Sequence, residues 1–184
     1  ALRAVHAGFY LSPHTLSIGL IGPGLVGGAL LDQLASQIER LRADVHLDLR
    51  VRGMLTSTRM LTADGEIDLG GWRAAWEQGG RASDLDAFVQ HVKAEHLPHA
   101  VIIDCSASAE VARHYRDWLA AGIHVVTPNK KANSGPLDYY TQLKDAARSA
   151  GTHFLYEATV GAGLPVIQTL RDLRETGDEV RSIE

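Results

Sequence analysis

The chain lacks several features that mark particular protein classes. It has one cysteine, Cys105, in 184 residues, which excludes an internal disulfide and is typical of a reducing compartment. Its 18 Lys and Arg are outnumbered by 22 Asp and Glu, and no basic stripe suited to nucleic acid is present. No apolar run approaches the roughly 20 residues of a membrane span, and the first residues do not resemble a secretory signal. We therefore expect a cytoplasmic protein whose partners include neither nucleic acid nor membrane.

Two common kinds of catalytic motif are also missing. The nine histidines form no H-E-x-x-H pattern and the lone cysteine no C-x-x-C pair, so a zinc site is not expected. No G-x-S-x-G nucleophile elbow occurs. With 45% hydrophobic and 22% charged residues, the chain has the composition of an ordinary globular domain with a substantial core.

A glycine-rich turn stands between an apolar run and a helical pattern near the start of the chain. Residues 16–21 lead into a G-x-G-x-x-G motif made by Gly22, Gly24 and Gly27, and apolar residues then recur at helical spacing as far as Leu41. Gly22 permits a tight turn, Gly24 leaves room for a pyrophosphate at the backbone, and Gly27 lets the helix pack closely on the strand. The free amides and dipole of such a helix attract an anion. In this setting the motif predicts dinucleotide binding.

Strands and helices alternate along the rest of the chain. We expect strands at 16–21, 47–55, 100–104, 123–127 and 153–157, and helices at 24–42, 84–96, 107–121, 136–150 and 164–176, with a loop and a short helix within 56–82. Ser83 is the expected N-cap of the helix that follows it, and Gly122 and Gly151 are expected to end two others. The alternation predicts an α/β fold, namely a Rossmann-type doubly wound, mainly parallel sheet with helices on both faces.

The chain is expected to be a piece of a longer protein, because it begins with Ala rather than Met. We assign residues 16–176 to the NAD(P)-binding Rossmann domain. Residues 1–15 are expected to be a connector from a preceding region. Residues 177–184 are expected to start the crossover to a further, catalytic domain.

The second strand ends without the acidic residue that often holds the ribose hydroxyls of NAD. The segment from Leu55 to Arg59 contains hydroxyls, among them Ser57, but no carboxylate, and Asp48 lies at the wrong end of the strand. A 2′-phosphate would be attracted to Arg59 by a charge-assisted contact, and the alternative is an exposed loop arginine. We expect Leu55, Ser57 and Arg59 to contact the cofactor, NADP or NAD.

Polar residues also follow the other strands. Ser106 either caps the next helix or offers its hydroxyl to the nicotinamide end of the cofactor. Lys130 is either solvated or faces the pocket, where it could hold a carboxylate, phosphate or carbonyl oxygen. Glu157, followed by a turn at 161–165, could converge with carbonyls on a cation. Cys105 is interpreted as a small buried hydrophobe rather than a nucleophile.

Three stretches taken together resemble homoserine dehydrogenases, namely Ile21–Gly28, Val126–Ala132 and Tyr156–Val166. The resemblance runs from about Leu16 to the last residue. Residues 4–12 are similar to the junction in bifunctional aspartokinase–homoserine dehydrogenases. The resemblance implies an NAD(P)-dependent oxidoreductase that interconverts L-homoserine and L-aspartate 4-semialdehyde in threonine and methionine biosynthesis.

The resemblance also implies roles for particular residues. The glycine loop with Leu25 and Val26 would hold the pyrophosphate, Ser106 would lie near the nicotinamide, and Lys130 would touch the cofactor close to the substrate. A monovalent cation, sodium, would be held by one carboxylate and main-chain carbonyls, at Glu157, Val160, Ala162 and Leu164. The family's catalytic lysine and acidic substrate-binding residues belong to a second domain that is not in this sequence. We therefore expect the chain to bind NAD(P) but to turn over homoserine negligibly, and the full-length enzyme to be a homo-oligomer.

Other functions fit part of the same pattern. Another NAD(P)-dependent dehydrogenase or reductase of amino-acid metabolism would share the glycine loop without needing the lysine and glutamate motifs. A non-catalytic dinucleotide-sensing module would need no substrate domain. A methyltransferase could also carry a glycine-rich first turn, but its usual acidic residue at the end of the second strand is missing.

Overall fold

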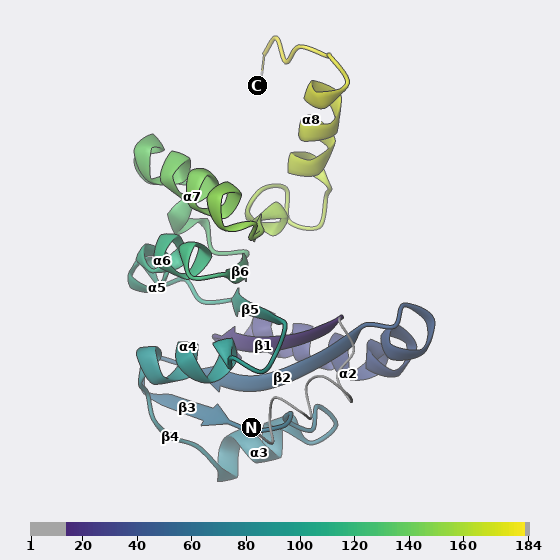
Figure 1. Ribbon diagram of the computed structural model, residues 1–184, viewed down its shortest axis with the longest axis vertical. Helices are drawn as coiled ribbons and strands as arrows, with labels where there is room; N and C mark the ends of the chain where they lie inside the picture. The colour runs from purple at the N-terminus through teal and green to yellow at the C-terminus, as the bar shows by residue number, and fades with distance from the viewer. Residues whose placement is uncertain (1–13, 183–184) are drawn as a thin grey trace.

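One sheet runs through the part of the chain that the structure describes, residues 14–182 of a computed structural model (Figure 1). Its strand order is β4-β3-β2-β1-β5-β6-β7. The strands are β1 (Thr15–Ile21), β2 (Asp48–Leu55), β3 (Arg59–Thr62), β4 (Arg81–Ala82), β5 (His99–Asp104), β6 (Ile123–Val126) and β7 (Phe154–Leu155). The neighbouring strands β2, β1, β5, β6 and β7 are parallel to one another. At one edge, β3 pairs antiparallel with β2, and β4 pairs antiparallel with β3. This confirms the predicted Rossmann-type, mainly parallel sheet.

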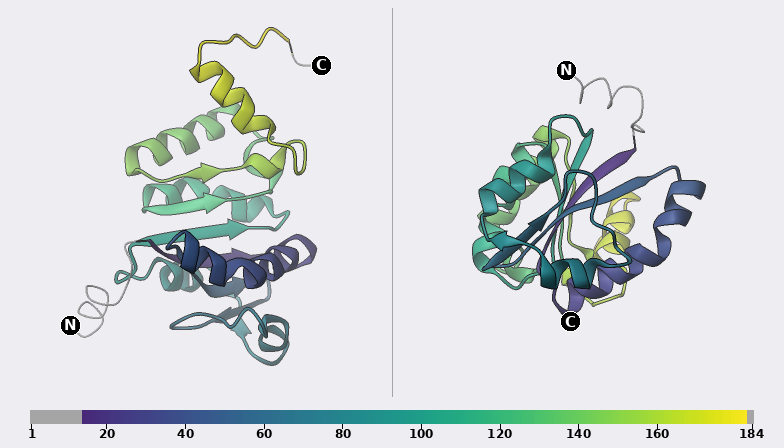
Figure 2. Two further views of the ribbon diagram at one scale, coloured as in Figure 1. Left: turned by 90° about the vertical axis from the view of Figure 1, so that its right-hand side faces the viewer. Right: turned by 90° about the horizontal axis from the view of Figure 1, so that it is seen from below.

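Helices cover both faces of the sheet (Figure 2). The α-helices are α2 (Leu25–Asp44), α3 (Trp72–Gln78), α4 (Leu85–Lys93), α5 (Ala109–Arg113), α6 (Tyr115–Ala120), α7 (Leu137–Ala150) and α8 (Val166–Glu175). Two short 3-10 helices, η1 (Lys130–Ala132) and η2 (Glu157–Thr159), follow β6 and β7. Figure 1 shows α3 beside the β4 edge and α8 beyond the β7 edge.

The sheet has a separate buried core on each face. Leu31 of α2 and Trp72 of α3 pack with alternate strand residues on one face. Phe88 of α4, Tyr115 of α6 and Leu143 of α7 pack on the other. Burial of each such large side chain contributes about 1.5–3 kcal/mol, so both layers hold the strand ends in place. In the described residues, no helix has the length and apolarity needed to cross a bilayer.

The segment 56–82 contains more structure than its composition predicts. The expected short helix is α3, but the same segment also supplies the two antiparallel strands β3 and β4. A tight turn joins β2 to β3, with the Thr56 amide donating to the Arg59 carbonyl at 2.7 Å. β3 is short and only partly buried, and both residues of β4 are exposed, so their sequence lacks a regular apolar alternation. Pairing of β3 with β2 and of β4 with β3 stabilises them instead.

Two helix boundaries differ from the prediction. Asp84, not Ser83, caps α4, because the Asp84 carboxylate accepts a hydrogen bond from the Ala87 amide at 2.9 Å. Ser83 instead donates its hydroxyl to the Thr56 carbonyl at 2.8 Å. The helix expected at 107–121 is two short helices, α5 and α6, separated at His114.

Two glycines end elements as predicted. Gly151 closes α7 with a left-handed φ of 66°, and Gly122 follows α6 with φ of 87°. Of the predicted connector 1–15, residues 1–13 lie outside the described residues, and Thr15 already belongs to β1. The division into connector, domain and crossover stays a prediction.

Candidate functional site

The glycine loop between β1 and α2 has the geometry that its sequence predicts. Gly22 adopts φ of 84°, and its amide donates to the Leu55 carbonyl of the neighbouring strand at 2.8 Å. A Cβ at Gly22 would lie 2.9 Å from the Ser106 amide nitrogen, and one at Gly27 would lie 2.2 Å from the Gly22 carbonyl. Both positions therefore require glycine, because the clashing atoms belong to the backbone.

The start of α2 is open where an anion would bind. A Cβ at Gly24 would meet nothing within 4 Å, in contrast to the other two glycines of the motif. Within the described residues, no hydrogen bond is recorded for the amides of Leu25, Val26 and Gly27. The Leu25 side chain is 93% exposed and Val26 is 55% exposed. Open amides at the N-terminus of a 20-residue helix are suited to an anion, and two apolar side chains lie beside them.

A buried carboxyl group at the end of β5 was not predicted from the sequence. Asp104 has no exposed surface. Its Oδ1 accepts from the Ser106 amide at 2.8 Å, and its Oδ2 accepts from Asn129 Nδ2 at 3.0 Å and from the Tyr115 hydroxyl. Burial, and then the nearby Asp104 charge, raise the pKa of Tyr115, so this hydroxyl stays protonated and donates. A final residue in an apolar strand gives no sequence signal that distinguishes such a role.

Ser106 is not the helix cap. Ser108 caps α5 by accepting from the Val111 amide at 3.2 Å, and Ser106 Oγ accepts from the Ser108 amide at 3.2 Å. The Ser106 hydroxyl keeps its proton available for a ligand, and its amide nitrogen lies against Gly22. The structure thus brings Ser106 next to the glycine loop, as expected for a residue near the bound cofactor.

Lys130 begins the turn η1 at the end of β6, and its side chain is exposed. No ion pair is recorded for its ammonium group among the described residues. The preceding Asn129 is 4% exposed and donates to the Ser108 carbonyl at 2.9 Å as well as to Asp104. Its Oδ1 accepts from the Lys131 amide at 3.1 Å. The backbone that carries Lys130 is therefore tied to the end of β5.

The side chains after β2 do not all lie as expected for residues that contact the cofactor. The Leu55 side chain is 3% exposed and belongs to the core, so Leu55 reaches the loop through its carbonyl. Ser57 is exposed in the β2–β3 turn. The Arg59 guanidinium stacks on Trp76, 5.1 Å from the ring centroid, and donates to the carbonyls of Glu77 at 2.9 Å and of Gly79. Its contact with a 2′-phosphate stays a prediction and would require the guanidinium to leave these carbonyls.

The surroundings of Cys105 and Asp48 bear on the interpretation of both residues. Burial, followed by the Asp104 charge, raises the pKa of Cys105 to about 11, which keeps the thiol protonated and fits the interpretation that it is not a nucleophile. Asp48 is the first residue of β2 and so lies at the end of this strand that is away from the glycine loop. Its carboxylate pairs with Arg42 at 3.2 Å and Arg50 at 2.8 Å.

The Glu157 carboxylate caps a helix. Its two oxygens accept from the amides of Ile167 and Gln168, at 2.8 and 2.9 Å, at the start of α8. The turn between η2 and α8 has positive φ at Gly161 (69°) and Ala162 (51°). The remaining residues of the predicted cation site, all in this turn, are Val160, Ala162 and Leu164. The Leu164 carbonyl accepts from the Val166 amide at 2.9 Å, so it is partly used within the protein.

Three histidines lie side by side near the amino ends of the neighbouring strands β5, β6 and β7. The His124 ring lies 6.2 Å from that of His99 and 5.2 Å from that of His153. The His153 amide donates to His124 Nδ1 at 3.0 Å. Their separation in sequence conceals this cluster. Within residues 14–182, no group of three or more His, Cys, Asp or Glu side chains is arranged to hold a metal ion.

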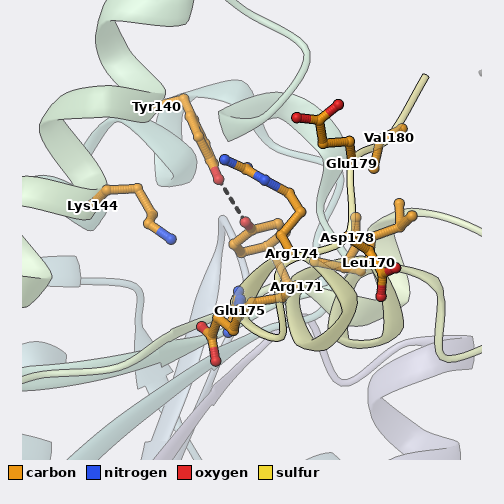
Figure 3. Close-up of a pocket in the computed structure, with 11 residues that line it drawn as sticks. Tyr140, Lys144, Leu170, Arg171, Arg174, Glu175, Asp178, Glu179 and Val180 are labelled. Carbon is orange, nitrogen blue, oxygen red and sulfur yellow. Dashed lines mark hydrogen bonds between the residues drawn. The ribbon is translucent and has the colours of Figure 1, made fainter. Parts of the chain in front are cut away.

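A hollow of about 1030 Å³ lies between α7 and α8 (Figure 3). Lys144, Arg171 and Arg174 line it together with acidic side chains at the end of α8 and just after it. The Tyr140 hydroxyl lies 2.7 Å from that of Tyr156. None of the predicted cofactor-binding residues lines this hollow, so it is separate from the glycine-loop site.

The chain is similar to known proteins over the region that contains the candidate site. Residues 22–157 match the family model described as homoserine dehydrogenase, NAD binding domain. The chloroplastic bifunctional aspartokinase/homoserine dehydrogenase 1 of Arabidopsis thaliana is 54% identical over 185 aligned positions, which cover 100% of this chain and 20% of that protein. The bifunctional aspartokinase/homoserine dehydrogenase of Haemophilus influenzae is 38% identical, over 100% of this chain and 22% of that protein.

A solved structure supports the same relationship. A hyperthermophilic archaeal homoserine dehydrogenase in complex with NADPH aligns with a TM-score of 0.67 and 26% identity, over 86% of this chain and 48% of that one. The chain therefore spans about a fifth of the length of the curated relatives and about half of this structural neighbour.

Proposed function

The chain belongs to the homoserine dehydrogenase family through its NAD-binding domain, and on this premise we propose that it binds a nicotinamide dinucleotide for an NAD(P)-dependent homoserine dehydrogenase. The observation that carries the proposal is the open start of α2. In the part of the chain that the structure describes, the amides of residues 25–27 have no recorded partner there, and a Cβ at Gly24 would meet no atom within 4 Å. A diphosphate fits such a corner because it takes up several N–H donors and the positive end of the helix dipole.

The residues at the neighbouring strand ends would then flank the nicotinamide. Ser106 adjoins the glycine loop, and Lys130 projects from the end of β6. The bound dinucleotide would supply or accept the hydride that interconverts L-homoserine and L-aspartate 4-semialdehyde. The Ser106 hydroxyl would orient the ring. The Lys130 ammonium would contact the cofactor and attract a carboxylate or carbonyl oxygen of the substrate beside it.

Replacing Gly24 tests the proposal directly. In Gly24→Ala the new methyl group meets no protein atom within 4 Å, yet it occupies the place proposed for the pyrophosphate. We expect NADPH affinity to fall by about 10- to 100-fold while the free energy of unfolding changes by less than about 0.5 kcal/mol. Fluorescence titration and urea unfolding measure the two quantities.

Gly65→Ala is the matched control, because Gly65 is also open on its Cβ side and lies away from the loop. This variant should bind NADPH like the original chain. Calorimetry that detects neither NADPH nor NADH, or a Gly24→Ala chain with unchanged affinity, would contradict the proposal.

We propose that NADPH is preferred to NADH. The turn from Leu55 to Arg59 contains no carboxylate that would repel a 2′-phosphate, and Ser57 and Thr58 are exposed there. The related archaeal enzyme was solved with NADPH, which supports the same choice. Parallel titrations with the two nucleotides test this preference, and tighter NADH binding would overturn it.

We propose that the rest of a longer protein supplies the residues that bind and deprotonate the substrate, and that the full-length enzyme is a homo-oligomer. The chain spans about a fifth of its curated relatives. We expect residues 1–184 to reduce NADP with homoserine at a negligible rate, measured by absorbance of the reduced nicotinamide. The single cysteine fits a reducing compartment, which we propose to be the cytoplasm or, as in the chloroplastic plant relative, a plastid.

We also propose that the turn after η2 holds a sodium ion. The carbonyls of Val160 and Ala162 have no recorded partner among the described residues, and Glu157 adds a carboxylate, so the turn offers hard oxygen ligands. Sodium chloride should raise the unfolding temperature more than an equal concentration of N-methylglucamine chloride. This difference should vanish in Glu157→Gln; a difference that persists would exclude the site.

A further inference from the structure

We propose that Asp104 is a positioning residue for the nicotinamide end of the cofactor and acts through Ser106 and Asn129 without touching the ligand. The inference rests on the proposed function, because it assigns a role within the same site. Asp104 has no exposed surface, so any effect on a bound ligand must pass through its neighbours.

Asp104 lies where three strand ends meet. It is the last residue of β5 and pairs with Ile21, the last residue of β1, directly before the glycine loop. The next amide, of Cys105, donates to the Ile21 carbonyl at 2.8 Å. On the other side, the Thr127 hydroxyl at the end of β6 donates to the Asp104 carbonyl at 2.7 Å. The carboxyl group is therefore held rigidly by the sheet on both sides.

The two carboxyl oxygens serve two different loops. Oδ1 accepts from the Ser106 amide at 2.8 Å, which fixes the turn after β5. Oδ2 accepts from Asn129 Nδ2 at 3.0 Å, which fixes the turn after β6. The Tyr115 hydroxyl donates to Oδ2 from the core side. It also lies 3.1 Å from the Thr127 hydroxyl, but it makes no hydrogen bond with Ser106 or Asn129 among the described residues.

These two loops carry the residues proposed to flank the nicotinamide. Ser106 presents its hydroxyl directly from the first loop. In the second, Asn129 Oδ1 accepts from the Lys131 amide at 3.1 Å and so shapes the turn on which Lys130 stands. One carboxyl group thus sets the separation between Ser106 and Lys130.

An amide cannot replace this carboxyl group. Asn at position 104 has one acceptor oxygen and one NH2 group. In one orientation the NH2 group faces the Ser106 amide, and in the other it faces Asn129 Nδ2, so a donor opposes a donor either way. Asp104→Asn must therefore release one of the two loops while keeping the size of the side chain.

The test compares two ligands that differ in the nicotinamide. NADPH contains the ring, whereas 2′-phospho-ADP-ribose lacks it and reports only on the pyrophosphate and adenosine contacts. For the 184-residue chain, we expect Asp104→Asn to weaken NADPH about tenfold and 2′-phospho-ADP-ribose less than about twofold. Calorimetry measures both. A general loss of structure would weaken the two ligands equally and would overturn the inference.

Tyr115→Phe is the matched control, because it removes a donor to the same carboxyl group but keeps the contacts of Asp104 with Ser106 and Asn129. It should lower the unfolding temperature and leave the affinities for both ligands within about twofold. If Asp104→Asn does not fold, Asn129→Ala releases the second loop alone and should show the same selective loss of NADPH affinity. Equal affinity losses for the two ligands in that variant would also overturn the inference. A parent chain that binds neither ligand would instead overturn the proposed function.

Discussion

The amino edge of the sheet, where its parallel strands begin, differs from the carboxyl edge, where they end. At the carboxyl edge, Asp104 is buried and paired, but other polar groups are left available. Among the described residues, the amides of residues 25–27 have no recorded partner, and Lys130 is exposed without an ion pair. At the amino edge, polar groups satisfy one another. The buried Arg52 donates to the carbonyls of His91 at 2.7 Å and Asp64 at 3.1 Å, and Asp48 pairs with two arginines.

We infer that the open polar groups serve ligand binding, whereas the paired polar groups serve the stability of the fold. Open donors at a helix start remain hydrated until a ligand replaces the water, so they cost little in the free protein. Paired groups at the amino edge can contribute only to the fold, because their partners are already within the protein. The largest effects on stability should therefore come from buried paired groups such as Arg52, and the largest effects on affinity from the open groups of the carboxyl edge.

The largest expected effect is on stability, in Arg52→Met. Arg52 is 3% exposed, and its removal leaves the carbonyls of Asp64 and His91 without these donors. We expect unfolding in urea to show a loss of about 3 kcal/mol, with NADPH affinity of the folded chain within about twofold. Arg113→Met is the control, because Arg113 is exposed and its ion pair is with the exposed Glu110. A comparable loss in both variants would remove the distinction between buried and exposed arginines.

Lys130→Ala should have the next largest effect, and it acts on binding. Because Lys130 is exposed, its removal should leave the unfolding free energy unchanged while NADPH affinity falls about tenfold. Lys131→Ala, on the next residue of the same turn, should change the affinity less than about twofold. Equal losses in the two variants would indicate a general charge effect rather than a directed contact.

Arg59→Ala sharpens the comparison at the β2 end of the carboxyl edge. If the guanidinium leaves the α3 carbonyls to hold a 2′-phosphate, the ratio of NADPH to NADH affinity should fall about fivefold. Arg81→Ala, a nearby exposed arginine in β4, should not change the ratio. An unchanged ratio in Arg59→Ala would show that Arg59 only ties β3 to α3.

The smallest expected effect is the dependence of stability on pH. Burial lowers the pKa of His91 below its ordinary 6.5, and burial together with His153 and His99 lowers that of His124. The folded state then binds fewer protons than the unfolded state, so stability is complete above about pH 6.5 and falls as the pH drops from there to the folded pKa values.

Urea unfolding at a series of pH values between neutral and mildly acidic measures this decrease, which should be smaller than the effect of Arg52→Met. His124→Asn should reduce the dependence on pH. Stability that stays constant or rises on acidification would contradict the assignment.

The elements with a strong local pattern were predicted well. The glycine loop, α2, α7 and the parallel strands each combine a regular apolar repeat with a cap or turn residue, such as Gly151 after α7. The strands β3 and β4 were missed because their stability comes from pairing, of β3 with β2 and of β4 with β3, rather than from their own residues. Ser83 was expected to cap α4, but it lies one residue before the Asp84 that does so, and both are favourable cap residues.

The candidate site was predicted in part. Residues at the ends of parallel strands necessarily share one edge, so the positions of Gly22, Ser106 and Lys130 followed from the order of elements. Which partner each side chain selects depends on segments far away in sequence. The Arg59 guanidinium turned to α3, and the Glu157 carboxylate turned to the α8 amides.

The sequence alone determined the fold class and the place of the glycine loop, because periodic apolar residues and glycine conformations act over a few neighbouring residues. Only the tertiary structure decided the roles of Asp104 and Arg52. A buried polar side chain is stabilised by the donors and acceptors that the fold brings to it, and those partners come from other strands and helices.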